Sequence, residues 1–320
     1  MRSVLRILLV LVLAFAAHAT RADEPWPSKP VKIVVPSSPG GGTDVFARLL
    51  AQAMSDALKQ PFVVENRPGA NGNIGAEAVA HSKPDGYTLL VAANASLAIN
   101  PEIQKSSSFD PAQDLTPVSR AVVSVNVLIA HPGAGGKTLP EFIAAAKKSP
   151  GAMAFGSAGS GTAPYLGVRM IEEQAGVKFL HAPYKGVGPA YQDLIAGRLQ
   201  FMYTDLASAL QYIQSGMVVA LAIDRKTPML PDVPTFAEGG LPKFDAPISF
   251  SVMAPAGIAP ALLQRIAQEI SAALRPLAPR LEKQGLIAVH DTPAEFAASL
   301  AAERAVWGQF IRRNDIRADQ

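Results

Sequence analysis

The stretch VKIVVPSSPGGGTDVFARLLAQAM, residues 31–54, holds the pattern that decides the fold. Its first five residues are rich in β-branched side chains and predict a buried strand, and the apolar residues from Phe46 onward recur at helical spacing. Thr43 and Asp44 precede that pattern as helix start signals. The sequence therefore predicts a strand, a glycine-rich loop and a helix in direct succession.

The same alternation continues along the chain. Strands are expected at residues 62–65 and 88–91, with a helix at 74–81 between them. Further strands are expected at 122–130, 152–155, 179–182, 201–203, 218–223 and 250–254, and further helices at 139–148, 164–175, 189–196, 207–214, 260–274 and 293–312. Such an order predicts an α/β protein whose sheets are mainly parallel and flanked by helices.

The chain is long enough for two lobes, and a proline-rich connector marks a passage between them. Residues 227–247 contain five prolines, which fix turns and interrupt regular strand pairing. We expect a first lobe of residues 24–123 plus 248–320 and a second lobe of residues 124–247. Two crossings between lobes predict a hinge that closes around a ligand.

The first residues predict a signal peptide at 1–19. Arg2 and Arg6 flank the start of an apolar run, residues 7–17, which ends in the small-residue cleavage pattern Ala-His-Ala. The run is too short for a membrane anchor, which needs about 20 apolar residues. A mitochondrial presequence is disfavoured because the run has no polar face. We expect cleavage after Ala19 and a soluble periplasmic protein.

Composition excludes several classes of function. Hydrophobic residues make up 49% of the chain and charged residues 17%, which is typical of a globular protein. No block of Lys and Arg occurs, and the formal net charge is only +3, so no nucleic-acid partner is expected. The absence of cysteine excludes disulfides, zinc–thiolate sites and cysteine nucleophiles.

Two glycine-rich loops are the strongest chemical features. Each lies between an expected strand and an expected helix, where backbone N–H groups and the positive end of the helix dipole favour an anion. The first loop comprises Ser37, Ser38, Pro39, Gly40, Gly41, Gly42, Thr43 and Asp44. The second comprises Ser157, Gly159, Ser160, Gly161 and Thr162. We expect the two loops to face each other across a cleft, although each could also be a tight strand-to-helix turn.

Other chemistries find little support. Neither loop carries the Lys-Ser/Thr of a P-loop or the later glycine of a dinucleotide fingerprint, and no G-x-S-x-G motif occurs. The histidines beyond the leader, at 81, 131, 181 and 290, show no metal-ligand spacing, so neither a metal nor a cofactor is expected. Tyr165, Tyr184 and Tyr203 lie near expected strand ends, where they could line a pocket or belong to the core.

Several motifs together resemble the Bug (TctC-like) family, the periplasmic binding subunits of tripartite tricarboxylate transporters. They are FVVENRPGANGNIGA at 62–76, PDGYTLL at 84–90, PYKG at 183–186, LPDVPT at 230–235 and APAG at 254–257. The resemblance spans almost the whole chain without its leader. It implies a two-lobe periplasmic binding-protein fold of type II-like topology, a small carboxylate in the cleft, and integral membrane subunits as partners. It also implies that both glycine-rich loops contact the ligand, largely through backbone groups and ordered waters.

The chain departs from the family pattern near the expected pocket. Tyr165 stands where the family often has His, Ser160 where it often has Asn, and Thr204 with Asp205 where an Asp-Asn pair is common. A frequent Trp is replaced near Ser249. Tyr165, Ser160, Thr204 and Asp205, together with Asn94, complete the expected ligand-binding set. Ser249 is not part of it. The identity of the carboxylate stays open.

Three functions follow for a monomeric exported protein of this kind. The binding subunit of a carboxylate importer is favoured, because export, two anion-binding loops and the lack of a catalytic constellation agree. A subunit that presents its ligand to a membrane sensor kinase would have the same fold. An exported hydrolase or isomerase would need a histidine close in space to Ser157, Ser160 or Asp205. Because neither loop holds a cation, we expect Arg48 and Arg67 to have surface or packing roles.

Overall fold

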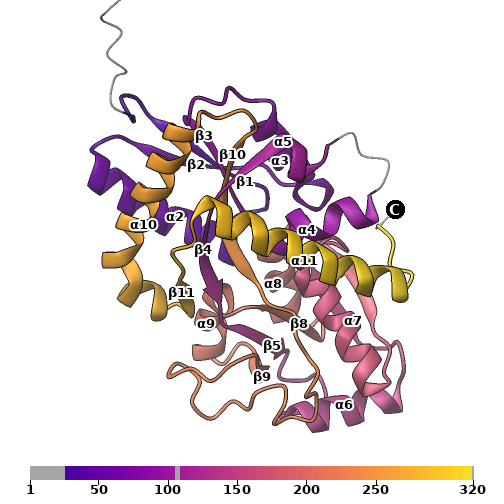
Figure 1. Cartoon of the computed structure of the whole chain (residues 1–320). Helices are drawn as coiled ribbons and strands as arrows, with labels where there is room; N and C mark the ends of the chain where they lie inside the picture. Colours follow the sequence, from indigo (N-terminus) through magenta and orange to yellow (C-terminus); the bar gives the residue numbers. More distant parts are fainter. Residues whose placement is uncertain (1–25, 105–108, 319–320) are drawn as a thin grey trace, which may run out of the picture.

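The computed structural model describes residues 26–104 and 109–318 (Figure 1). Its strands form a six-stranded sheet of order β11-β4-β10-β3-β1-β2 and a five-stranded sheet of order β7-β6-β8-β5-β9. We call the part around the six-stranded sheet the first lobe and the part around the five-stranded sheet the second lobe. The expected signal peptide lies outside the described residues.

The first lobe combines the beginning and the end of the chain. It contains β1 (Val31–Val35), α2 (Gly42–Leu58), β2 (Phe62–Asn66), η1 (Ala70–Gly72), α3 (Asn73–Ala80), β3 (Thr88–Ala93), α4 (Asn94–Ile103), α5 (Pro111–Asp114), β4 (Leu115–Ser124), β10 (Ser249–Pro255), α10 (Pro260–Glu282), β11 (Leu286–Ala288) and α11 (Pro293–Arg313). Ile33 of β1 packs in one core cluster with Phe46 of α2 and Ile266 of α10, whereas the next residue, Val34, packs with Val79 and Phe296. Side chains of a strand alternate between the two faces of the sheet, so helices pack on both faces.

The second lobe is built from the middle of the chain. It contains β5 (Asn126–Ala130), α6 (Leu139–Lys148), β6 (Ala154–Ser157), α7 (Ala163–Ala175), β7 (Leu180–Pro183), α8 (Val187–Ile195), β8 (Phe201–Asp205), α9 (Leu206–Gln214) and β9 (Val219–Ile223). Its core includes Phe142, Phe155, Phe179 and Phe201, whose rings pack together in stacked, tilted and edge-on contacts.

The two lobes are joined by crossing strands, which corrects two expectations. The run at 122–130, expected to be one strand, is divided by Val125 into β4 of one sheet and β5 of the other. The sheets are mixed and not mainly parallel, because β10 pairs antiparallel with β3 and β4, and β5 pairs antiparallel with β8 and β9. β4 leaves the first lobe and β10 returns to it, so the two strands run in opposite directions.

Some elements had no clear local signal. α4 was not expected, since it begins with polar residues and contains Pro101. α10 continues eight residues beyond its expected end through Pro276 and Pro279, which a sequence pattern would treat as helix breaks. None of the helices in the described ranges is long and apolar enough to span a bilayer.

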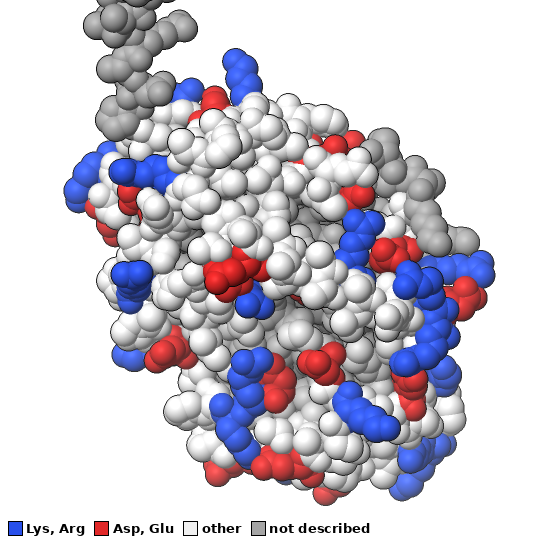
Figure 2. All heavy atoms as spheres, viewed as in Figure 1, with Lys and Arg blue, Asp and Glu red and all other residues white. Residues whose placement is uncertain are grey.

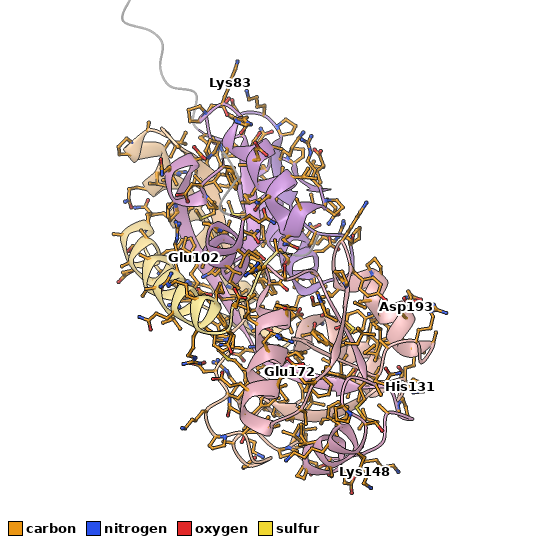
Figure 3. All side chains as sticks on the ribbon, turned by 90° about the vertical axis from the view of Figure 1, so that its right-hand side faces the viewer. Lys83, Glu102, His131, Lys148, Glu172 and Asp193 are labelled. Carbon is orange, nitrogen blue, oxygen red and sulfur yellow. The ribbon has the colours of Figure 1, made fainter. Side chains whose placement is uncertain are left out.

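The C-terminal helix α11 ties the lobes together on the outside of the molecule. In Figure 3, Glu102 of α4 lies beside this yellow helix, where it accepts a hydrogen bond from Arg312 at 2.9 Å. At the end of α11, Arg313 pairs with Glu173 of α7 in the second lobe at 3.1 Å. α11 therefore contacts both lobes.

Candidate ligand-binding site

A cavity of about 430 Å³ lies between the two lobes. It receives residues from both glycine-rich loops and from the strands next to the hinge. Among the residues predicted to bind ligand, its lining includes Ser37, Gly41, Gly42, Thr43, Gly159, Thr162 and Asp205. The two loops therefore do face each other across a common space.

Six helices begin at this cavity. The lining includes the N-cap or first residue of α2, α3, α4, α7, α8 and α9. Of these six N-termini, only that of α9 has a side-chain cap, which is provided by Asp205. Of the α-helices in the described ranges that begin elsewhere, α5, α6 and α11 are capped by Asp110, Thr138 and Thr292, and α10 has no side-chain cap. Uncapped N-termini leave backbone N–H donors and the positive ends of helix dipoles at the cavity, an arrangement that favours an anion.

Asp44 shapes the first loop from behind. Its carboxylate accepts hydrogen bonds from the Gly40 N–H at 3.1 Å, from Arg48 at 2.9 and 3.0 Å, and from Asn66 at 3.0 Å. Burial alone would raise the pKa of Asp44, but these donors lower it below its usual value. Asp44 does not line the cavity, so its contacts fix the loop conformation.

Ser157 has the corresponding place in the second loop. Its Oγ lies 2.7 Å from Nε2 of His181 and accepts the Gly159 N–H at 3.1 Å, while Thr162 donates to the Gly159 carbonyl at 2.7 Å. A histidine is therefore close in space to Ser157, as a hydrolase would require. However, Ser157 is fully buried and does not line the cavity. The pair fixes the shape of the loop around Gly159.

The lobes touch each other beside the cavity through glycine-rich contacts. Both the backbone N–H and the Oγ of Ser38 donate to the carbonyl of Lys185, at 3.2 and 3.1 Å. A Cβ at Gly188 would overlap the carbonyl of Pro39. On another side, a Cβ at Gly161 would overlap the side-chain oxygen of Asn100. Glycine permits this close approach of backbone to the opposite lobe.

Asp205 and Lys185 are the charged residues in the cavity lining. Asp205 caps α9 by accepting the Ser208 N–H at 2.9 Å, and its carboxylate lies against Gly42 at the start of α2. Burial raises the pKa of Asp205, against the lowering effect of hydrogen bonding to its carboxylate. Lys185 is exposed and was not among the predicted site residues.

The remaining predicted residues lie outside the lining. Ser38, Pro39, Gly40, Ser160 and Gly161 belong to the two loops but do not face the cavity. Tyr165 packs on the His181 ring at 4.6 Å between centroids, and Thr204 lies 3.3 Å from the hydroxyl of Tyr191. Asn94 is buried beside Glu303 of α11. Of the other two candidate tyrosines, Tyr184 lines the cavity and Tyr203 is buried in the core.

Several lining residues had no signal as ligand contacts. The segment Gly69, Ala70, Asn71 and Gly72 lines the cavity with four successive positive φ angles, of 129°, 48°, 55° and 96°. Ser96 and Gln104 of the α4 region, and Ile248 and Phe250 at the hinge, also line it. The GANG sequence at 69–72 was part of the family resemblance but carried no expected role. Positive φ in non-glycine residues is typical of functional segments.

A second cavity, of about 540 Å³, lies beside the end of α11, and its charged lining residues pair with one another as Arg312 with Glu102 and Arg317 with Asp315. Figure 2 shows basic and acidic side chains intermixed over the face in view. Across residues 26–104 and 109–318, no group of three or more His, Cys, Asp or Glu could hold a metal ion.

Comparisons with known proteins agree with this architecture. Residues 46–315 match the model of the "Tripartite tricarboxylate transporter family receptor" family, TctC. Protein BugT of Bordetella pertussis (strain Tohama I) is 36% identical over 318 residues, covering 98% of this chain and 97% of BugT.

Two solved structures are similar throughout. Rpa4515 of R. palustris with adipate is 29% identical, with a TM-score of 0.88, covering 91% of this chain and 99% of that chain. MatC (Rpa3494) of Rhodopseudomonas palustris with bound malate is 30% identical, with a TM-score of 0.82, covering 89% and 100%. The resemblance to the Bug family and the two-lobe fold are thereby confirmed. The chain belongs to the TctC family of tripartite tricarboxylate transporter receptors, which are periplasmic solute-binding proteins and not enzymes.

Proposed function

We propose that this protein captures a small carboxylate between its lobes and delivers it to the integral membrane subunits of a tripartite transporter. The observation that carries the proposal is the convergence of six helix N-termini on one cavity, five of them without a side-chain cap. Backbone N–H groups at such ends stabilise a carboxylate without a full counter-charge, provided that its lone pairs are satisfied. Ordered waters complete the shell.

The ligands of similar proteins support the class of ligand. Rpa4515 was solved with adipate and MatC with malate, and both are aliphatic dicarboxylates. Apolar side chains of Val187, Ile248 and Phe250 also line the cavity and suit a carbon chain between polar ends.

In the proposed function, some residues of the two loops contact the ligand and others hold the loop conformation. The ligand contacts are Ser37, Gly41, Gly42, Thr43, Gly159 and Thr162, which line the cavity. Asp44 and Ser157 hold the loops in shape from behind. The lobes, residues 24–123 with 248–320 and residues 124–247, close around the ligand, and the chain is exported through its leader, residues 1–19.

Differential scanning fluorimetry on residues 20–320 tests the binding function. Adipate and L-malate are expected to raise the melting temperature, while the neutral diamide of adipate is not. Saturation at about 100 times the Kd stabilises the native state by about 2.7 kcal/mol. If neither these nor other mono-, di- and aromatic carboxylates shift the transition, the proposal is wrong.

Export and delivery need separate measurements. Mass analysis of the protein recovered from the periplasm should find a new N-terminus at Thr20. Chemical cross-linking in ligand-supplied cells should join the protein to integral membrane transport subunits. Cross-linking to a sensor kinase alone would instead favour the ligand-presenting role.

A further inference from the structure

A chain of side-chain amides runs from the inside of the first lobe to the cavity. Nδ2 of Asn100 donates to Oδ1 of Asn73 at 2.8 Å, and Nδ2 of Asn73 donates to Oε1 of Gln104 at 2.6 Å. Asn100 and Asn73 are buried and do not line the cavity, whereas Gln104 does. Gln104 is therefore the end of the chain that a ligand can reach.

The direction of this chain is fixed at its buried end. Nδ2 of Asn100 also donates to the backbone carbonyl of Asn71 at 3.0 Å, and a carbonyl can only accept. The amide of Asn100 thus cannot be turned round without losing that bond. Asn73 must then present its oxygen to Asn100 and its N–H₂ group to Gln104. Consequently Gln104 must accept through Oε1.

Gln104 is left with a donor at the cavity. Within the described residues, its Nε2 group donates to no other residue, and its oxygen is held by Asn73. Hydrogen bonds in a chain polarise one another, which strengthens the donor character of the last N–H₂ group. The side-chain oxygen of Asn100 lies against Gly161 of the second lobe. Closure of the lobes therefore brings the second lobe onto the first amide of this hydrogen-bonded chain.

We propose that Gln104 determines ligand specificity by donating a hydrogen bond to an oxygen acceptor at the far end of the ligand. This rests on the proposed function, in which the first carboxylate is held at the helix N-termini. A second carboxylate satisfies the donor, whereas a methyl end leaves it unpaired in a closed cavity. Asn73 and Asn100 are positioning residues that set the orientation of Gln104. The preferred class of ligand is a dicarboxylate.

Isothermal titration calorimetry with matched ligand pairs tests the assignment. Adipate is compared with hexanoate, and L-malate with 3-hydroxybutyrate, because each pair has one chain length and differs in a terminal carboxylate. Gln104→Met is expected to weaken binding of the preferred dicarboxylate about 10-fold or more and to leave its monocarboxylate partner unchanged. Gln268→Met, on the exposed side of α10, is the control and should change neither.

Asn73→Asp tests the direction of the chain. An aspartate accepts from both neighbours, so Gln104 turns its N–H₂ group toward residue 73 and presents its oxygen to the cavity. The dicarboxylate preference should fall as in Gln104→Met, and the double variant should lose no more than either single change. A residue with a merely structural role would weaken both ligands of a pair alike.

The outcomes separate this inference from the proposed function. Equal weakening of both ligands in a pair by Gln104→Met, or unchanged dicarboxylate binding, overturns the role of Gln104 while the binding function stands. A folded wild-type protein that binds none of the four ligands, nor any other carboxylate, overturns both. Circular dichroism melting of each variant confirms that the fold is retained.

Discussion

The carboxylate of Asp205 in the second lobe lies against the backbone of Gly42, the first residue of α2 in the first lobe. The same carboxylate caps α9 through the N–H of Ser208, whereas α2 has no side-chain cap, so one side chain lies at the N-termini of two helices from different lobes. The contact is so close that a Cβ at Gly42 would overlap the carboxylate. Glycine at position 42 is therefore a condition for the lobes to meet at this point.

Gly42→Ala should strongly impair ligand binding, because its new methyl group displaces Asp205 and holds the lobes apart. Gly41→Ala is the matched control, since its Cβ would meet only the tip of the Val187 side chain, at 2.8 Å. Calorimetry should show a much larger loss of affinity for Gly42→Ala. Small-angle scattering should find a smaller radius of gyration on carboxylate saturation for the wild type but not for Gly42→Ala. Equal affinity in the two variants would contradict this role of Gly42.

Lys185→Ala should weaken carboxylate binding severalfold, and the loss should shrink as salt is added. Within the described ranges, Lys185 is the cationic side chain of the cavity lining, and its exposure limits the size of the effect. Arg67→Ala is the comparison, because Arg67 pairs with Glu65 outside the cavity. Titration with adipate should leave its Kd unchanged in Arg67→Ala. A complete loss of binding in folded Arg67→Ala would show that the cavity site is incomplete.

Ala70→Gly should stabilise the protein by about 0.5–1 kcal/mol. Ala70 has a φ of 48°, which costs about 1–2 kcal/mol for a residue with a Cβ, and glycine regains most of this despite its larger entropy in the unfolded chain. Ala57→Gly, in an exposed helical position of α2, should destabilise by a similar amount. Urea unfolding of both variants measures the change in the free energy of unfolding. A loss of stability in Ala70→Gly would contradict backbone strain at Ala70.

Glu303→Gln should make the protein more stable at pH 8 but not at pH 4.5. Burial raises the pKa of Glu303 from 4.5 to about 7, against the lowering effect of hydrogen bonds from Trp307 and Asn94. Between these values the folded state binds the proton more tightly than the unfolded state, so the free energy of unfolding falls as pH rises. The gain at pH 8 should be about 1–3 kcal/mol.

Thermal unfolding of Glu303→Gln from pH 4.5 to 8 measures this slope. Glu282→Gln, at an exposed position on α10, is the control and should follow the wild-type profile. A parallel shift of Glu303→Gln at every pH would mean that the substitution acts through packing and not through the proton.

Local patterns were enough to predict most of the helices and strands and both glycine-rich loops. β1 and α6 begin and end where the sequence placed them, because β-branched runs, helical spacing and caps act over a few residues. The same locality explains why Gly41, Gly42, Gly159 and Thr162 were candidates that do line the cavity. A strand-to-helix turn exposes its N–H groups whatever surrounds it.

The other residues that line the cavity with these loops could not be predicted, because contacts between distant segments place them there. Ala93 lines the cavity while the next residue, Asn94, turns to Glu303 more than 200 positions away, and no local pattern distinguishes the two faces of that strand end. Lys185 and Gln104 reach the cavity only because β4 crosses to β5 at Val125 and brings the second lobe against the first. The sequence alone thus determined the two glycine-rich turns and their exposed N–H groups. Tertiary structure decided which side chains line the cavity, because burial and lobe contact are properties of the packed chain.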